Sequence, residues 1–164
     1  MNRIVYMVLR HLPIVPYWFW KIDHMGKRPD QYPEQERYDY LRNIIKTINQ
    51  NGRVTVRGYG EEQLPKENGF ILFPNHQGFF DMLAIIDTCP KPLGVIIKKE
   101  AANWILVKQV LRLLGGIPMD RSDIRAAMEV IKEMTRQVKE GKNYVIFPEG
   151  TRSEERRVGK ECRS

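Results

Sequence analysis

The chain has 164 residues, 42% of them hydrophobic, which is enough to bury one core and excludes an intrinsically disordered protein. Its net charge of +7 predicts attraction to polyanions, whether nucleic acid, an anionic membrane surface or phosphorylated substrates. The two cysteines, Cys89 and Cys162, lie far apart in no metal-binding spacing, so neither a disulfide framework nor a zinc site is predicted.

The first predicted unit, residues 1–35, is an apolar and aromatic segment that ends in a polar connector from Gly26 to Gln35. Between Ile4 and Trp20 it contains an arginine and two prolines, which argues against a membrane-spanning helix of roughly 20 apolar residues. Its tyrosine and tryptophan rings and its basic residues are instead typical of a helix that lies on an anionic lipid surface. The alternative is an amphipathic arm that packs on its own domain.

The second predicted unit begins at residue 36 and alternates between helices and strands. Apolar residues at helical spacing predict a helix over Tyr40–Ile48, and alternating ones predict a half-exposed strand over Arg53–Tyr59. Continuous apolar runs predict buried strands over Phe70–Phe73 and Gly94–Ile97.

Two further helices and one strand complete this alternation. The spacing from Trp104 to Leu114 predicts a helix that two glycines end, and Tyr144–Phe147 is a further buried strand. Between them, Ser122 is expected to cap a helix whose apolar stripe is Ile124, Ala127, Met128, Ile131 and Val138. The alternation predicts an α/β fold with a largely parallel or mixed sheet flanked by helices, and functional residues in loops at strand ends.

One candidate catalytic pair follows the strand Phe70–Phe73, in the sequence NHQGFFD that ends at Asp81. Histidine is the side chain best suited to remove a proton from a hydroxyl near neutral pH, and a nearby carboxylate would hold one ring tautomer. His76 in the loop and Asp81 in the first turn of the next helix are therefore expected to meet, with Gly78 permitting the close approach. The alternative is a helix start with a capping carboxylate and an uninvolved histidine.

Two later blocks are GGIPMDR, ending at Arg121, and FPEGTR, from Phe147 to Arg152. Together with NHQGFFD and the lysine-containing block Lys98-Lys99-Glu100, they resemble in order and spacing the bacterial 1-acylglycerol-3-phosphate acyltransferases. The resemblance runs from about Val54 to Arg152.

The resemblance implies a reaction in which His76 is the general base and Asp81 orients it. The histidine would take the proton from the sn-2 hydroxyl of 1-acylglycerol 3-phosphate as that hydroxyl attacks an acyl thioester, giving phosphatidic acid for phospholipid biosynthesis. The donor would be acyl-CoA or acyl-acyl carrier protein, with no further cofactor and no metal. A covalent serine is not expected, since the sequence contains no GxSxG elbow.

The resemblance also implies which residues bind the acceptor. Arg121 would bind its phosphate through a planar fork of donors, with Lys98 as a second contact. The third block would add Glu149, Gly150, Thr151 and Arg152. The alternative for Arg121 is a surface arginine paired with a neighbouring aspartate. The alternative for the third block is a strand-terminating turn with a solvated glutamate.

The implied partners are the acyl thioester donor, the lysophospholipid acceptor and a membrane surface, with acyl carrier protein as the alternative carrier of the donor. The implied location is the cytoplasmic face of the cell membrane, with peripheral or monotopic attachment. Nucleic acid is not an expected partner, because the basic residues are dispersed. Two alternatives stay open: an acyltransferase for glycerol 3-phosphate or another lysophospholipid, and an inactive membrane-binding fragment.

The resemblance places a partial acyltransferase domain at residues 36–151. The family's fourth, proline-containing block has no counterpart here, so the sheet is expected to be incomplete at the C-terminus. Residues 152–164 resemble a translated DNA-sequencing adapter, which makes the origin of Arg152 ambiguous. The alternative is a native, solvated charged tail.

Overall fold

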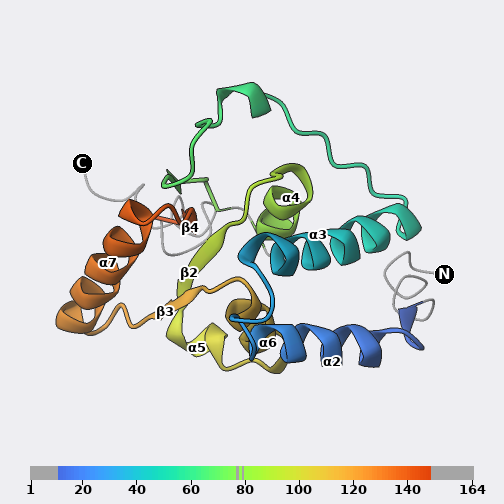
Figure 1. Ribbon diagram of the computed structural model, residues 1–164, viewed down its shortest axis with the longest axis horizontal. Helices are drawn as coiled ribbons and strands as arrows, with labels where there is room; N and C mark the ends of the chain where they lie inside the picture. The colour runs from blue at the N-terminus through green and yellow to red at the C-terminus, as the bar shows by residue number, and fades with distance from the viewer. Residues whose placement is uncertain (1–10, 77, 79, 149–164) are drawn as a thin grey trace, which may run out of the picture.

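A four-stranded parallel sheet in the order β1-β4-β2-β3 forms the centre of the molecule (Figure 1). The computed structural model describes residues 11–76, 78 and 80–148. The strands are β1 (Ile71–Leu72), β2 (Gly94–Lys98), β3 (Ile117–Met119) and β4 (Tyr144–Ile146). The predicted α/β fold is confirmed, and the strand order places β1 and β3 at the two edges.

Helices cover both faces of this sheet. They are α2 (Val15–Gly26), α3 (Glu34–Asn51), α4 (Phe80–Thr88), α5 (Lys99–Ala102), α6 (Ile105–Leu113) and α7 (Ile124–Lys139), with a short 3-10 helix at Glu61–Gln63. Figure 1 shows α7 on one side of the strands and α2, α3, α4 and α6 on the other. Side chains alternate along a strand, so Val95 and Val145 enter the core with these four helices, while Ile96 and Tyr144 enter the core with α7.

Helix α2 packs against α6 with one face and is exposed on the other. Met25 is fully buried, and Gly26 approaches α6 so closely that a Cβ there would lie 3.1 Å from the backbone nitrogen of Leu113. Tyr17 and Trp20 on the outer face are more than half exposed. The predicted division at residue 35 falls in the first turn of α3, a helix that shares one core with α2.

The N-terminal part of the predicted surface segment, residues 1–10, lies outside the described residues. Within residues 11–76, 78 and 80–148, no helix combines the length and apolar character that a membrane span requires.

The predicted strand over Arg53–Tyr59 is wrong. In the part of the chain that the structure describes, this stretch has no regular structure and pairs with no strand, and the described partner of β1 is β4. Arg53 has a positive φ of 54°, which turns the chain away from the end of α3. Alternating polarity here reflects an exposed loop whose Val54 is 39% exposed. The structure also contains β3 and α5, two short elements that the apolar pattern does not predict.

The start and the buried stripe of α7 also differ from prediction. Asp123 is the cap, since its Oδ1 accepts the backbone N–H groups of Arg125 and Ala126 at 2.9 and 3.1 Å. Ser122, the predicted cap, instead donates its hydroxyl to Asp120. The residues of α7 that pack on the sheet are Ala127, Val130, Met134 and Val138.

The predicted stripe of α7 is rotated relative to this buried face. Ile124 is 78% exposed and Met128 is 55% exposed, whereas Met134 is 4% exposed. Apolar residues occur on more than one side of this helix, so periodicity alone did not identify the side that meets the sheet.

Candidate active site

The carboxyl ends of the four parallel strands meet at one edge of the sheet, and each predicted block follows one of them. In parallel α/β sheets this edge is where ligands bind. β1 leads into the loop of His76, β2 ends at Lys98, β3 leads to Arg121, and β4 leads to Phe147. The topology therefore gathers at one edge blocks that are far apart in the sequence.

His76 and Asp81 lie in hydrogen-bond contact at this edge. The Nδ1 atom of His76 is 3.0 Å from Oδ2 of Asp81, and the same oxygen accepts the backbone N–H of Gly78 at 2.9 Å. Helix α4 begins at Phe80, so Asp81 lies in its first turn and faces back over the preceding loop. Both side chains are half-buried, at 28% and 22% exposure.

The chemical consequence concerns the two ring nitrogens. A carboxylate only accepts, so in the neutral ring this contact favours the tautomer with its proton on Nδ1. That tautomer carries its basic lone pair on Nε2, which is the atom a general base uses. The pair can therefore accept a proton while the carboxylate stabilises the resulting imidazolium.

Phe147 packs directly against the imidazole. The two ring centroids are 4.6 Å apart and the planes are inclined at 45°. This contact places the start of the FPEGTR block beside the NHQGFFD block, as expected from the pairing of β4 with β1. Sequence reasoning did not assign Phe147 a role at the site, and the signal was its position at the end of a buried strand.

The expected steric role of Gly78 is not supported. A Cβ at this position would meet nothing within 4 Å among the described residues. Among the described residues, residue 78 contacts the pair through its backbone N–H, which it donates to the carboxylate.

The basic residues of the site occupy the other end of the same edge. Lys98 pairs with Glu100, and Lys99 pairs with Asp120, each at 3.2 Å. Arg121 is exposed and makes no hydrogen bond or ion pair with any residue that the structure describes.

The sheet order separates these basic residues from the histidine. β3 lies three strand intervals from β1, which corresponds to about 14 Å at about 4.8 Å per interval. β2, which ends at Lys98, is two intervals from β1. A ligand that contacted both ends would therefore have to extend along the edge.

The third block continues beyond the part of the chain that the structure describes. Glu149, Gly150, Thr151 and Arg152 lie outside it, as does the predicted adapter-derived tail at residues 152–164. Among residues 11–76, 78 and 80–148, no group of three His, Cys, Asp or Glu side chains is arranged to hold a metal ion.

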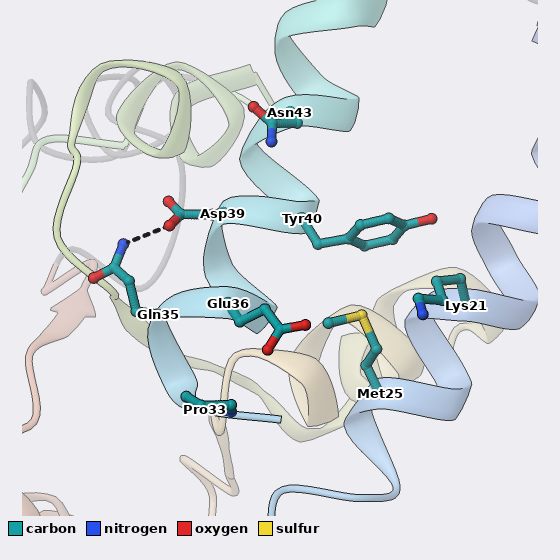
Figure 2. A pocket seen from close by; sticks show the side chains of 8 residues that line it. All are labelled: Lys21, Met25, Pro33, Gln35, Glu36, Asp39, Tyr40 and Asn43. Carbon is teal, nitrogen blue, oxygen red and sulfur yellow. Dashed lines mark hydrogen bonds between the residues drawn. The ribbon is translucent and has the colours of Figure 1, made fainter. Parts of the chain in front are cut away.

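A separate open pocket of about 540 Å³ lies between α2 and α3 (Figure 2). Its lining residues are Lys21, Met25, Pro33, Gln35, Glu36, Asp39, Tyr40 and Asn43. Figure 2 shows Lys21 and Met25 on α2 facing Tyr40 and Glu36 on α3, and Gln35 bonded to Asp39. None of these residues belongs to a predicted block, so this pocket is distinct from the site at His76.

Comparison with known proteins identifies one family. The model of the acyltransferase family matches residues 53–163. The 1-acyl-sn-glycerol-3-phosphate acyltransferase of Bacillus subtilis is 29% identical over 119 residues, which are 72% of this chain and 58% of that protein. The enzyme of the same name from Cocos nucifera is 40% identical over 85 residues, 51% of this chain and 28% of that protein.

A solved structure has the same fold. The crystal structure of the 1-acyl-sn-glycerophosphate (LPA) acyltransferase PlsC from Thermotoga maritima superposes with a TM-score of 0.66 at 24% identity. The match covers 92% of this chain and 62% of the Thermotoga chain. This chain thus spans less than two thirds of the length of each of these three proteins.

Proposed function

The chain belongs to the acyltransferase family, and we propose that it transfers a fatty acyl group to the sn-2 hydroxyl of 1-acylglycerol 3-phosphate. The product is phosphatidic acid, and the donor is acyl-CoA or acyl-acyl carrier protein. The observation that carries this proposal is the His76–Asp81 contact at the edge where all four strands end. The names of the relatives from Bacillus subtilis and Cocos nucifera support the choice of acceptor.

In the proposed reaction, Nε2 of His76 takes the proton of the acceptor hydroxyl as its oxygen attacks the thioester carbonyl carbon. The C–S bond then breaks, and the leaving thiolate takes the proton back from the imidazolium. Asp81 stabilises the imidazolium between these two transfers, because its Oδ2 atom lies 3.0 Å from Nδ1. Phe147 covers one side of the ring and limits the approach of water there.

The acceptor phosphate is proposed to bind at the opposite end of the edge, at Arg121 and Lys98. Arg121 has no competing partner among the described residues, so its guanidinium donors face no internal carboxylate. A fork of donors matches a phosphate with two parallel hydrogen bonds. Glu149, Gly150, Thr151 and Arg152 are proposed to contact the glycerol backbone, since they follow β4, the strand next to β1.

We further propose that the chain acts at the cytoplasmic face of the cell membrane, where its lipid acceptor resides. Tyr17 and Trp20 on the outer face of α2 are 54% and 55% exposed, and Lys21 follows them on the same helix. Aromatic rings and basic side chains in this arrangement suit the headgroup region of an anionic membrane. Acyl carrier protein is a proposed partner only if the acyl donor is acyl-acyl carrier protein rather than acyl-CoA.

The test is a thiol-release assay on the folded chain, with acyl-CoA and acyl-acyl carrier protein as alternative donors and with 1-acylglycerol 3-phosphate and glycerol 3-phosphate as alternative acceptors. We expect thiol release that depends on 1-acylglycerol 3-phosphate, and a loss of about a hundredfold or more in kcat for His76→Ala. Circular dichroism of each variant shows that the comparison is made between folded proteins.

Other outcomes would change the acceptor, the donor, the mechanism or the proposed activity. Preference for glycerol 3-phosphate would replace the proposed acceptor. Thiol release with acyl-acyl carrier protein but not with acyl-CoA would identify the donor. Acceptor-dependent release that His76→Ala leaves unchanged would remove the proposed mechanism. A folded chain that binds vesicles and releases no thiol with either donor would be an inactive membrane-binding module.

A further inference from the structure

The carboxylate of Asp120 forms hydrogen bonds that order the loop after β3 around Arg121. Oδ1 of Asp120 accepts the backbone N–H of Ser122 at 3.0 Å and its hydroxyl at 2.6 Å. Oδ2 of the same side chain accepts Nζ of Lys99 at 3.2 Å. The residues before and after Arg121 are therefore tied to each other, and the loop is tied to the start of α5.

This arrangement follows from the sheet register. Lys98 of β2 is paired with Met119 of β3, so the residues that come next, Lys99 and Asp120, leave adjacent strands side by side. Their ion pair connects the two strand ends. Asp120 accepts at both oxygens, which leaves it little capacity to contact a ligand directly.

These contacts stabilise the charged form of Asp120. The hydroxyl and backbone N–H of Ser122, followed by Lys99, lower the pKa of Asp120 to about 2. The carboxylate stays ionised at any pH at which the enzyme would work, so its contacts with Ser122 and Lys99 are retained.

Arg121 itself is different from the residues around it. Its neighbours Asp120 and Ser122 are hydrogen-bonded to each other, whereas its own side chain makes no hydrogen bond or ion pair with any described residue. The contacts of Asp120 order the backbone that carries Arg121, while its guanidinium stays available to a ligand. Such preorganisation reduces the entropy lost when the ligand binds.

We propose that Asp120 is a positioning residue, which fixes Arg121 for the phosphate monoester of the acceptor without touching the acceptor itself. The inference rests on the proposed function for the identity of the ligand. It assigns the effect to acceptor binding, so the acyl donor and the proton-transfer step at His76 are expected to be unaffected. A carboxylate one residue from a phosphate-binding arginine would repel the phosphate if it faced the ligand, and here Lys99 and Ser122 occupy it.

The test separates the two parts of the Asp120 contact. Asp120→Ala removes both, whereas Asp120→Asn keeps an oxygen for the two donors of Ser122 and loses the ion pair with Lys99. We expect Asp120→Ala to raise KM for 1-acylglycerol 3-phosphate by about tenfold, with kcat and KM for acyl-CoA unchanged. Asp120→Asn should give a smaller increase, because the turn around Arg121 remains.

A double-mutant cycle with Arg121→Ala shows whether Asp120 acts through the arginine. In the Arg121→Ala background, removal of the Asp120 carboxylate should raise KM for the acceptor no further. An equal increase in both backgrounds would overturn the inference, and so would a parallel increase in KM for acyl-CoA, since either result indicates a general loosening of the fold.

Calorimetric titration of 1-acylglycerol 3-phosphate into His76→Ala protein, with and without Asp120→Ala, keeps this test independent of turnover. A tenfold weaker affinity caused by Asp120→Ala would support the inference even if the chain released no thiol and the proposed function failed. Unchanged affinity, or no binding by either protein, would overturn it.

Discussion

The imidazole of His76 is held by a carboxylate only five residues further along the chain. Such a contact depends on a loop and one helical turn, so it was within reach of sequence reasoning. The second hydrogen bond that Asp81 accepts, from the backbone N–H of Gly78, was not predicted. It shows that the carboxylate also orders the loop that carries the histidine, which is why a substitution at Asp81 needs a variant of matched shape.

Asp81→Asn is that variant, and it should lower kcat by about a hundredfold or more. The amide oxygen still accepts the backbone N–H of Gly78, so the loop is retained, but the neutral side chain no longer stabilises a charged imidazolium. The measurement is kcat for acceptor-dependent thiol release, with thermal unfolding as the control for the fold. Unchanged kcat in a protein of normal Tm would contradict the role of the carboxylate.

At the scale of the element, helix α7 depends on Asp123 for its N-terminal cap. The carboxylate satisfies two backbone donors of the first turn, while the neighbouring Ser122 hydroxyl is engaged by Asp120. Two polar residues in succession could each have capped this helix. The sequence did not indicate which one, because the choice depends on a contact made before the helix begins.

Asp123→Ala should therefore lower the free energy of unfolding by about 1 kcal/mol. Ser122→Ala is the matched control, one residue away, and should change it by less than about 0.5 kcal/mol. Chemical denaturation of the two variants provides the comparison. The reverse order of effects would show that Ser122 caps the helix in solution.

The contact between β4 and α7 predicts a stability change at alkaline pH. The hydroxyl of Tyr144 donates to Oε1 of Gln137 at 2.5 Å, and burial raises the pKa of Tyr144 to about 12 from an ordinary value near 10. The folded state therefore keeps the phenol neutral at a pH at which the unfolded chain ionises. This contribution is fully present below pH 10 and is lost as the pH rises to about 12.

Denaturation at a series of pH values between 9 and 12 measures this loss, and the fall should be smaller in Tyr144→Phe than in the wild type. Tyr59→Phe removes a hydroxyl from a side chain that is 87% exposed, and serves as the control for the loss of a tyrosine. Equal falls in the wild type and in Tyr144→Phe would contradict the assignment.

At the scale of the whole molecule, the sequence predicted the parallel sheet and the gathering of the blocks, but not the order of the strands. Apolar runs mark β2 and β4 because both are buried on two faces. The order β1-β4-β2-β3 depends on long-range pairing that no local pattern contains. That order places β3, which leads to Arg121, and β1, which leads to His76, at opposite edges of the sheet. The predicted acceptor contacts of Glu149 to Arg152 stay predictions, because these residues lie outside the described part of the chain.

The proposed membrane surface is also a property of the whole molecule, because α2 packs with one face and exposes the other. Replacement of Tyr17 and Trp20 by serine should weaken binding to phosphatidylglycerol vesicles by about tenfold or more. Replacement of Ile124 and Met128 by serine removes exposed apolar side chains from α7 on the opposite side of the sheet, and is the matched control. Vesicle co-sedimentation that falls equally in both variants would argue against a specific surface on α2.

Asp81 holds His76 through Nδ1, so that Nε2 is the basic atom of the neutral ring. The most direct test is the long-range ¹⁵N–¹H NMR spectrum of the histidine side chains, with His76 assigned by comparison with His76→Ala. We expect a neutral His76 with its proton on Nδ1 in the wild type, and a shift toward the other tautomer in Asp81→Ala, in which no carboxylate accepts the Nδ1 proton. A wild-type His76 that carries its neutral-state proton on Nε2 would contradict it.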